Sequence, residues 1–388
     1  MTLLAPQTST AVSLPRPTPG RWLRGHVLGS GSFGNVSLAV DLDERLLFAV
    51  KSAPLLSPLK SSCLQNELDI LSKLDSPRIV RCLGSDISTV NHVPCFNLFL
   101  EYMPGGSVAD VIQRSGGSLD ERRAAACVRA VLEGLCYLHE QGIVHCDIKA
   151  RNILLGLRGE VKIADFGASL VLSGLQSYED CQIKGTPLWM APEVLQGLQQ
   201  GTSSDIWSLG CTLIEMLQGR LPWDYTGGHG SSKDIAALLF KIACSTDSLP
   251  PVESSLSEEA KDFLSKCLCR DPNGRWTAEQ LLQHPFVMMK EEAPLEYEGL
   301  TSPRSTLHIF EDGTESVSDR SPRSFMPLDS TINMQQLGQR GARAEDGSAA
   351  WYTIKCSKDW SEVRQKPFFG SGEEVLLRRK GSEVSFKP

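Results

Sequence analysis

The chain has 388 residues, of which 41% are hydrophobic and 22% charged, so it can bury a core large enough for one large domain or two ordinary ones. Its net charge of −7 argues against nucleic acid as a partner, because phosphate backbones attract basic surfaces. No apolar run approaches the roughly 18 residues that a membrane helix needs, so no membrane partner is expected either. The 12 cysteines occur without any CxxC pair, which favours reduced thiols over a metal site.

Proline, serine and threonine dominate residues 1–21, which are expected to form a flexible leader. This leader lacks a basic start followed by an apolar stretch, so we expect no secretory signal and a cytoplasmic location, or a nuclear one as well. Apolar residues then alternate with polar or small ones over 36–40, and this period of two predicts a strand. Further strands are predicted over 46–51 and 97–103, with a helix between them where leucines recur at helical spacing.

Helical patterns replace the strands after Gly105 and Gly106. An apolar stripe at helical spacing covers 119–141. Later helices are predicted over 206–217, 235–242 and 258–267. A β-rich segment followed by a longer α-rich segment is typical of an α+β fold.

We place one domain at 22–286, with a small β-rich lobe at 22–103 and a large α-rich lobe at 104–286. Residues 287–388 are dominated by polar residues, glycine and proline, and their apolar periodicity fades, so they are predicted to form a mostly disordered, low-order regulatory tail. Within it, residues 351–369 hold too many aromatic residues for a plain linker, and this stretch is a candidate docking segment for a regulator.

Residues 29–36 read GSGSFGNV and fit the pattern G-x-G-x-x-G-x-V. Glycines let a backbone approach phosphates closely and donate N–H groups to them. A dinucleotide-binding turn must be followed by a helix, whereas the residues after this segment alternate as a strand. The segment therefore indicates a glycine-rich hairpin over a nucleotide, with a plain turn as the alternative.

Lys51 ends an apolar strand, and Glu67 lies on the apolar stripe of the helix that follows. Each charge would be costly to bury alone, so the two side chains are expected to form an ion pair. A lysine paired in this way can hold the phosphates of ATP. The alternative is that Lys51 is a surface residue whose aliphatic stem covers apolar side chains.

Residues 145–152 read HCDIKARN and follow an amphipathic helix. Asp147 can orient a substrate hydroxyl and accept its proton, Lys149 can neutralise charge on a moving phosphoryl group, and Asn152 can hold a metal ion. The next strand ends in Asp165 of a DFG sequence, which would chelate Mg²⁺ bridging the phosphates. Phosphoryl transfer mainly needs such positioning and charge neutralisation.

Together these motifs resemble those of the eukaryotic protein kinases. The sequence GTPLWMAPE at 185–193 matches the A-P-E segment of that family, and DIWSLG at 205–210 matches the start of its D-x-W-S-x-G helix. Arg275 matches the arginine that pairs with the A-P-E glutamate, here Glu193, and we expect a buried ion pair between them. The resemblance covers 22–286 and implies the two-lobed protein kinase fold, with ATP in the cleft.

The resemblance also implies roles for individual residues. Lys149 and Thr186 resemble those of the serine/threonine class, and the Thr186 hydroxyl is expected to form hydrogen bonds near Asp147 and Lys149. The catalytic residues implied are Asp147, Lys149, Lys51 and Thr186, and the metal ligands are Asn152 and Asp165. The nucleotide-binding residues implied, with Leu100 as gatekeeper and the hinge at 101–103, are Leu28, Gly29, Ser30, Gly31, Ser32, Phe33, Gly34, Val36, Ala49, Lys51, Glu67, Leu100, Glu101, Met103 and Leu154.

The segments GTPLWMAPEV, FAVKSA and LGSGSFGNVSLA resemble mitogen-activated protein kinase kinase kinases, and most of all the short plant branch. This implies a serine/threonine kinase that uses ATP and Mg²⁺ to phosphorylate a downstream mitogen-activated protein kinase kinase. One alternative is a serine/threonine kinase of another subfamily. The other is an ATP-binding pseudokinase scaffold, which predicts loss of Lys51, Asp147, Asn152 or Asp165, whereas all four are present.

Two positions depart from the family pattern. Trp276 stands where proline is usual, which we expect to change only local packing, and Cys146 stands where arginine usually precedes the catalytic aspartate. That arginine grips a phosphate on the activation segment, and cysteine has neither the charge nor the forked donors for this contact. We therefore expect activity that depends little on phosphorylation of residues 165–193, unless Arg129 or Arg151 takes over the phosphate.

Overall fold

The computed structural model describes residues 17, 19–31, 34–90, 92–172, 183–223, 232–245, 248–288, 360–367, 373–379 and 382–386. Its described residues up to Met288 fall into two compact units. The first holds residues 19–74 and 80–102, and the second holds 75–79 and 103–288. Among the described residues, none of the helices is both long enough and apolar enough to cross a lipid bilayer.

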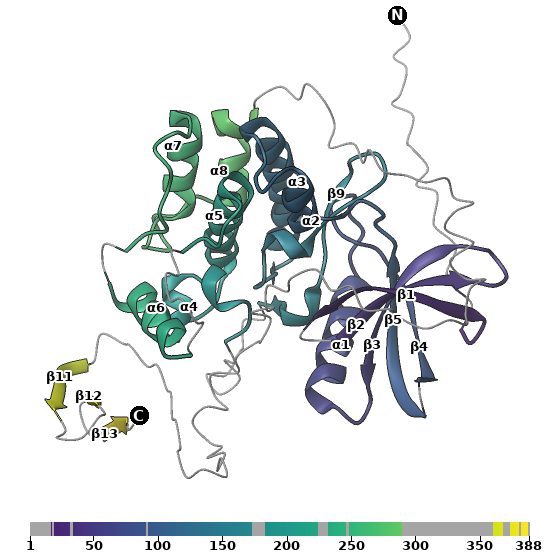
Figure 1. Ribbon diagram of the computed structural model, residues 1–388, viewed down its shortest axis with the longest axis horizontal. Helices are drawn as coiled ribbons and strands as arrows, with labels where there is room; N and C mark the ends of the chain where they lie inside the picture. Colours follow the sequence, from purple (N-terminus) through teal and green to yellow (C-terminus); the bar gives the residue numbers. More distant parts are fainter. Residues whose placement is uncertain are drawn as a thin grey trace, which may run out of the picture. The chain divides into compact units, whose positions relative to one another are not determined.

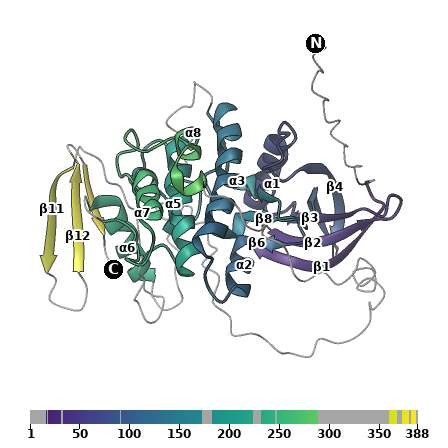
Figure 2. The same cartoon turned by 90° about the horizontal axis from the view of Figure 1, so that it is seen from above.

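The first unit is a five-stranded antiparallel sheet with one helix (Figure 1, Figure 2). The strand order is β1-β2-β3-β5-β4, with β1 (Trp22–Gly31), β2 (Gly34–Asp41), β3 (Leu47–Pro54), β4 (Cys82–Val90) and β5 (Val93–Glu101). Helix α1 (Pro58–Leu71) begins with proline at its first position, where a missing N–H costs nothing. It packs on β3, β4 and β5. The strands predicted in this region and the helix between them are confirmed.

The two faces of this sheet bury different side chains, because successive residues of a strand point to opposite sides. Phe48 and Phe99 lie on one face with ring centroids 5.0 Å apart, and Trp22 packs edge-on against both rings. These rings form an aromatic core together with Val50. Lys51, the next residue after Val50, therefore points to the other face, on which α1 lies.

The second unit consists mainly of helices (Figure 1). The helices are α2 (Val108–Arg114), α3 (Glu121–Glu140), α4 (Pro192–Leu195), α5 (Thr202–Gln218), α6 (Ser232–Cys244), α7 (Glu258–Cys267) and α8 (Ala278–Leu282). The short strands are β6 (Gly106–Ser107), β7 (Ile143–Val144), β8 (Ile153–Leu155), β9 (Val161–Ile163) and β10 (Leu170–Val171). Side-chain caps begin several helices, with Ser107 at α2, Asp120 at α3 and Ser257 at α7. All the helices predicted after Gly106 are present.

Helix α5 is buried along almost its whole length, although Ser, Thr, Asp and Glu recur among its apolar residues. It packs against α3 and α7. Gly210 permits the close approach to α7, because a Cβ at this position would lie 2.8 Å from the Cβ of Cys267. The helix ends at Gly219, which takes the left-handed conformation that favours glycine. It therefore forms the centre on which the loops of this unit are fixed.

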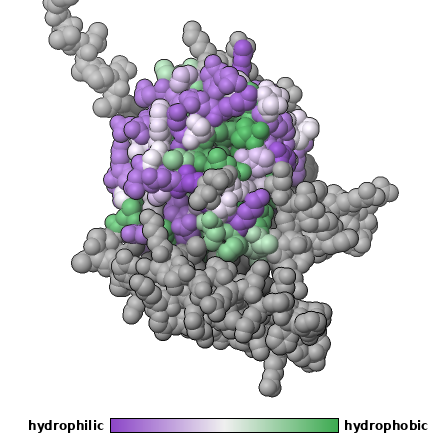
Figure 3. Space-filling view, turned by 90° about the vertical axis from the view of Figure 1, so that its left-hand side faces the viewer, coloured by the Kyte–Doolittle hydropathy of each residue, from purple (hydrophilic) through white to green (hydrophobic). Residues whose placement is uncertain are grey.

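The surface of the molecule is uneven in polarity. Figure 3 shows hydrophobic side chains gathered in the middle of an otherwise mainly hydrophilic face. Exposed apolar residues of the second unit include Leu198, shortly after α4, and Phe240 on α6, with 52% and 47% of their surface accessible.

Helix α6 is held beside α4 by Gln196, and its carboxyl end is capped by Arg270, which donates to the carbonyl of Ile242 at 2.6 Å.

Three strands lie inside the region expected to be a low-order tail. They are β11 (Trp360–Pro367), β12 (Glu373–Arg379) and β13 (Ser382–Phe386), which pair as an antiparallel sheet. The register places Val375 opposite Phe386 and Leu377 opposite Val384. The low-order regulatory tail stays a prediction. Apart from Val287 and Met288, the rest of the predicted tail, including most of the candidate docking segment at 351–369, lies outside the described residues.

Candidate active site

An ion pair lies on the face of the sheet that carries α1. The ammonium of Lys51 on β3 lies 2.6 Å from Oε2 of Glu67 on α1, and the two side chains are 7% and 0% exposed. The predicted pair is confirmed, and the alternative of a surface lysine is wrong. Because Glu67 is fixed on a packed helix, it holds the ammonium in a defined position.

The glycine-rich segment is a hairpin between β1 and β2, as expected from the alternation that follows it. Its register pairs Gly29 with Val36, Ser30 with Asn35 and Gly31 with Gly34. A Cβ at Gly34 would overlap the carbonyl oxygen of Ser52, and its φ of +146° also favours glycine. No helix follows, so this is not a dinucleotide-binding turn. Ser32 and Phe33, which were predicted to contact nucleotide, lie outside the described residues.

Several residues predicted to bind nucleotide share one face of the sheet. The register places Val36 opposite Lys51 and Ala49 opposite Leu100, so these four residues lie on the face that bears the ion pair. Ala49 and Leu100 are buried, and Val36 is half-buried. The first unit therefore presents an apolar surface next to a fixed cation.

The remaining predicted nucleotide residues are divided between the two units. In the first unit, Leu28 is exposed, and the carboxylate of Glu101 accepts a hydrogen bond from the backbone N–H of Arg81 at 3.2 Å. In the second unit, Met103 is buried and Leu154 on β8 is half-buried. The contact of these four residues with nucleotide stays a prediction.

The predicted catalytic residues of the second unit meet in one hydrogen-bonded cluster. The Thr186 hydroxyl donates to Oδ1 of Asp147 at 2.6 Å and accepts from the Lys149 ammonium at 2.8 Å. The same ammonium lies 3.1 Å from Oδ2 of Asp147, and Asn152 Nδ2 donates to that oxygen at 3.0 Å. The expected hydrogen bonds of Thr186 are confirmed, and they join segments 39 residues apart in sequence.

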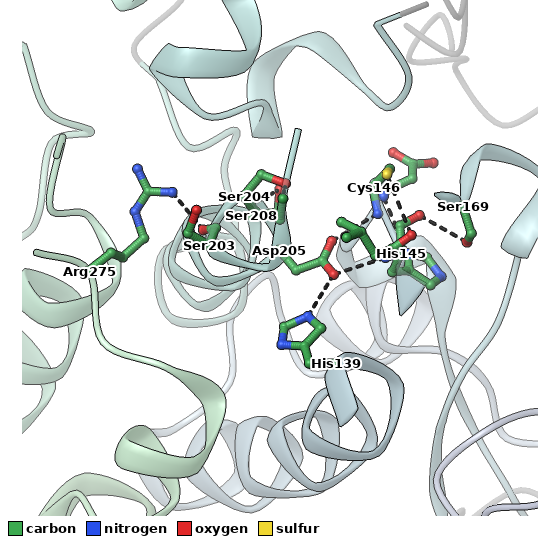
Figure 4. A network of polar contacts seen from close by, with 12 residues as sticks. His139, His145, Cys146, Ser169, Ser203, Ser204, Asp205, Ser208 and Arg275 are labelled. Atoms are coloured by element: carbon green, nitrogen blue, oxygen red, sulfur yellow. Dashed lines mark hydrogen bonds and ion pairs between the residues drawn. The ribbon is translucent and has the colours of Figure 1, made fainter. Parts of the chain in front are cut away.

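Asp205 near the start of helix α5 holds the loop at residues 145–152, which is called the catalytic loop below (Figure 4). Its carboxylate accepts hydrogen bonds from the backbone N–H groups of His145 at 2.9 Å and Cys146 at 2.8 Å. The imidazole of His139 lies 2.9 Å from the same carboxylate. Asp205 has no solvent exposure, so these contacts satisfy a buried charge and hold the loop in one position.

Further along α5, Thr212 donates to the carbonyl of Ile148 at 3.2 Å, and Glu215 accepts from the backbone N–H of Ala150 at 3.3 Å. Burial raises the pKa of Glu215 to about 7, although the hydrogen bond from Ala150 opposes this shift. Neither residue was predicted from the sequence. Polar residues recurring on one side of an otherwise apolar helix, as Asp205, Thr212 and Glu215 do, could have revealed them.

Two residues of the candidate site have left-handed backbone conformations. Cys146 has a φ of +70° and Asp165 a φ of +67°, and neither is glycine. Such conformations cost of order 1–3 kcal/mol and persist only where surrounding contacts enforce them. His145 supplies those contacts, since its ring packs on Phe166 at 4.9 Å and its Nε2 lies 3.0 Å from the carbonyl of Ala164.

The two predicted metal ligands offer oxygen donors, which suit Mg²⁺. Asn152 Nδ2 donates to both the carbonyl and the carboxylate of Asp147, which leaves the amide oxygen as its remaining polar atom. Asp165 adds a carboxylate on the next segment. Among the described residues, no group of three or more His, Cys, Asp or Glu could hold a metal. Two ligands of this kind fit Mg²⁺ sites that substrate phosphates complete.

The segment after Thr186 is anchored at several points. Ser208 on α5 donates to the carbonyl of Trp189 at 2.8 Å, and the Trp223 indole donates to the carbonyl of Leu188 at 3.1 Å. At its end, the guanidinium of Arg275 contacts both carboxylate oxygens of Glu193, at 2.7 and 3.1 Å. This buried pair was predicted from the sequence and is confirmed.

The two departures from the family pattern differ in their surroundings. Trp276 packs against His284 at 6.0 Å and lies under the Lys266 ammonium, so it belongs to a local packing cluster. Cys146 is buried, and burial raises the pKa of its thiol well above the ordinary value. It therefore stays neutral and offers no charge to a phosphate.

Of the two basic residues considered as replacements, Arg129 lies 3.4 Å from Glu133 in an exposed pair, and Arg151 is exposed. Residues 173–182 of the activation segment lie outside the described residues. The effect of Cys146 on regulation therefore stays a prediction.

Comparison with known proteins shows which family the chain belongs to. Residues 22–287 match the protein kinase domain. The chain is 42% identical over 283 residues to mitogen-activated protein kinase kinase kinase 17 of Arabidopsis thaliana, which covers 72% of this chain and 73% of that protein. It is 41% identical over 279 residues to mitogen-activated protein kinase kinase kinase 18 of the same organism, with coverage of 70% and 78%. The chain therefore belongs to the protein kinase family and is similar to serine/threonine kinases of the mitogen-activated protein kinase kinase kinase group.

Proposed function

We propose that this chain acts as a mitogen-activated protein kinase kinase kinase, which transfers the γ-phosphoryl group of ATP to serine or threonine of a downstream kinase kinase. The observation that carries the proposal is the cluster of Asp147, Lys149 and Thr186, in which both oxygens of one carboxylate are held by fixed donors. The similarity to two plant kinases with this name supports the cascade position.

Asp147 is the proposed base. Thr186 holds one of its carboxylate oxygens, and Lys149 and Asn152 hold the other. A carboxylate has about four lone-pair sites, so the group can still accept a hydrogen bond from a substrate hydroxyl. As the hydroxyl oxygen bonds to the γ-phosphorus, its proton passes to Asp147, the bond to the β,γ-bridging oxygen breaks, and ADP leaves.

The two lysines have separate tasks in this proposal. Lys149, 3.1 Å from the base, is placed to offset charge on the phosphoryl group in transit. Lys51, held by Glu67, is placed to orient the phosphates of ATP. When bound by Asn152 and Asp165, Mg²⁺ would supply further neutralisation of phosphate charge.

Specificity for serine or threonine in a protein is supported by the rigid segment after Thr186. Leu188 and Trp189 are buried, and their carbonyls are held by Trp223 and Ser208. A peptide lying along a fixed segment brings its hydroxyl to the base in one geometry, and such positioning is the main requirement of phosphoryl transfer.

The test is single-turnover transfer from γ-labelled ATP to a panel of purified kinase kinases whose own catalytic lysine has been replaced. We expect labelled serine or threonine in their activation loops, and loss of the label with Asp147→Asn. The matched control is Asp69→Asn, the same change at an exposed carboxylate on α1. Transfer by Asp147→Asn at the normal rate would contradict the mechanism. Absence of transfer to any kinase kinase, with transfer to other proteins, would contradict the cascade position.

A further inference from the structure

Arg151 is an exposed arginine inside the catalytic loop, four residues after the proposed base. It lies in the 3-10 turn Ala150–Asn152, whose two other residues are buried. The backbone N–H of Ala150 donates to Glu215 at 3.3 Å, and the amide of Asn152 donates to the carbonyl of Asp147 at 2.8 Å. The backbone of Arg151 is therefore held on both sides, while its side chain is left at the surface.

The guanidinium of Arg151 makes no hydrogen bond and no ion pair with any residue that the structure describes. By contrast, Arg114 donates to the carbonyl of Gly105 at 2.7 Å. Arg270 likewise donates to the carbonyl of Ile242 at 2.6 Å. Within the described part of the chain, all five donors of Arg151 and both two-donor edges of its planar fork are therefore available to a ligand.

The charge of Arg151 acts near the segment that is proposed to carry the peptide. Burial raises the pKa of Glu215, and the indole of Trp189 and the charges of Lys149 and Arg151 oppose this shift. Glu215 therefore lies within the electrostatic range of both cations and close to Trp189, which belongs to that segment. No ion pair joins Arg151 to Glu215, so the guanidinium keeps its capacity for another carboxylate.

A bound substrate must bring its acceptor hydroxyl to Asp147, so the residues next to the acceptor pass close to Arg151. The distance between the Cα atoms of Asp147 and Arg151 is at most about 14 Å, because four residues can span no more. The hydrogen bond from Asn152 to the carbonyl of Asp147 folds this stretch back and shortens that distance. An extended peptide advances about 3.3 Å per residue, so a substrate side chain roughly two to four positions from the acceptor comes within reach of the guanidinium.

We propose that Arg151 determines specificity for protein substrates that carry a glutamate or aspartate within about four residues of the acceptor serine or threonine. The two donors along one edge of the guanidinium bind the two oxygens of that carboxylate, which fixes the peptide beside the base. This contact involves no covalent step. The inference rests on the proposed function, because it takes Asp147 as the group that receives the acceptor hydroxyl.

The test compares pairs of peptide substrates on the full chain. Each peptide holds one serine in a neutral background and a single glutamate at one position within about four residues on either side of it, and its partner has glutamine there. Initial rates of transfer from γ-labelled ATP give kcat/KM for every peptide. We expect at least one glutamate peptide to exceed its glutamine partner by about fivefold, the upper range for an exposed ion pair.

Substitutions at Arg151 identify the residue that reads the glutamate. Arg151→Gln should abolish the preference, and Arg151→Glu should invert it, so that a peptide with lysine at the same position is used better than the glutamate peptide. The matched control is Arg158→Gln, the same change at another exposed arginine of this unit, in the turn between β8 and β9. The control should keep the preference of the parent.

Equal kcat/KM for every glutamate peptide and its glutamine partner would overturn the inference. It would also be overturned if Arg151→Gln lowered transfer to both members of a pair alike, because that result indicates a role inside the enzyme, such as holding a phosphate of its own activation segment. The glutamine peptides report phosphoryl transfer by themselves. Absence of transfer to every peptide would therefore contradict the proposed function, and this inference together with it.

Discussion

Two buried ion pairs, one in each unit, have nearly the same geometry. The Lys51–Glu67 pair has an N–O distance of 2.6 Å, and the Glu193–Arg275 pair has one of 2.7 Å. All four side chains are at most 7% exposed. The first pair was predicted from the cost of burying each charge alone in an apolar segment, and the second from the resemblance to kinase motifs.

The pairs differ in what else surrounds the cation. Arg275 contacts Glu193 at two points, donates to the carbonyls of Ser203 and Cys269, and stacks over Trp207 at 5.3 Å. Most of its five donors are therefore used for holding segments of the fold together. Lys51 instead shares a sheet face with the apolar residues predicted to bind nucleotide. Burial and pairing thus mark a residue as important, and its other neighbours distinguish a structural role from a catalytic one.

Removing the cation from the first pair should have the largest effect on activity. We expect Lys51→Met to lower single-turnover phosphoryl transfer by at least about a thousandfold, close to 4 kcal/mol in the barrier. Because Glu67 would be left buried and unpaired, the double variant Lys51→Met/Glu67→Gln should recover thermal stability without recovering activity. Near-normal turnover in either variant would mean that the Lys51–Glu67 pair, like the Glu193–Arg275 pair, only stabilises the fold.

Removing the cation from the second pair should act on stability. Arg275→Ala leaves the Glu193 carboxylate buried without its partner, which typically costs about 3–5 kcal/mol in the free energy of unfolding. Urea denaturation measures the effect. Arg129→Ala is the matched control, since its pair with Glu133 is exposed and should contribute about 0–1 kcal/mol. If both variants unfold at the same urea concentration, the comparison between buried and exposed pairs fails.

Glu215 is a third buried carboxyl group, and burial raises its pKa more than its hydrogen bonds and nearby cations lower it. Its pKa of about 7 when folded lies above the ordinary value of 4.5, so the folded protein binds this proton more tightly. The stabilisation is fully present below pH 4.5 and is lost as pH rises through 7, with an upper limit of about 3 kcal/mol because the residue keeps some solvent exposure.

Replacing Glu215 with glutamine should therefore flatten the fall in unfolding free energy between pH 5 and pH 7, measured by urea denaturation. Glu258→Gln, the same change at a side chain that is 88% exposed, is the control and should leave the slope unchanged. An unchanged slope in Glu215→Gln would show that this carboxyl is ionised throughout the range.

The smallest effect on activity is expected from dephosphorylation of the activation segment. Cys146 stands where arginine is usual, so this position offers no cation to a phosphate. Kinase isolated from a host that phosphorylates the activation segment should keep most of its activity on a downstream kinase kinase after phosphatase treatment. A hundredfold drop, about 2.7 kcal/mol in the barrier, would show that another cation grips the phosphate. Cys146→Arg should then add sensitivity to phosphatase only where a residue of the segment is modified.

The sequence by itself determined the chemistry of the candidate site and the order of its elements. Lys51, Asp147 and Asp165 stand in short motifs, and such motifs can be recognised because each role needs particular residue types at a set spacing along one chain. Periodicity also predicted the main strands and helices, since burial of one face imposes a period of two or 3.6 residues.

Only the tertiary structure decided which distant residues support that chemistry. Asp205 and Glu215 hold the catalytic loop from a helix about 60 residues later in the chain, and no local pattern names their partners. Hydrogen bonds act over about 3 Å, so they report proximity in space, which the sequence encodes only through the whole fold.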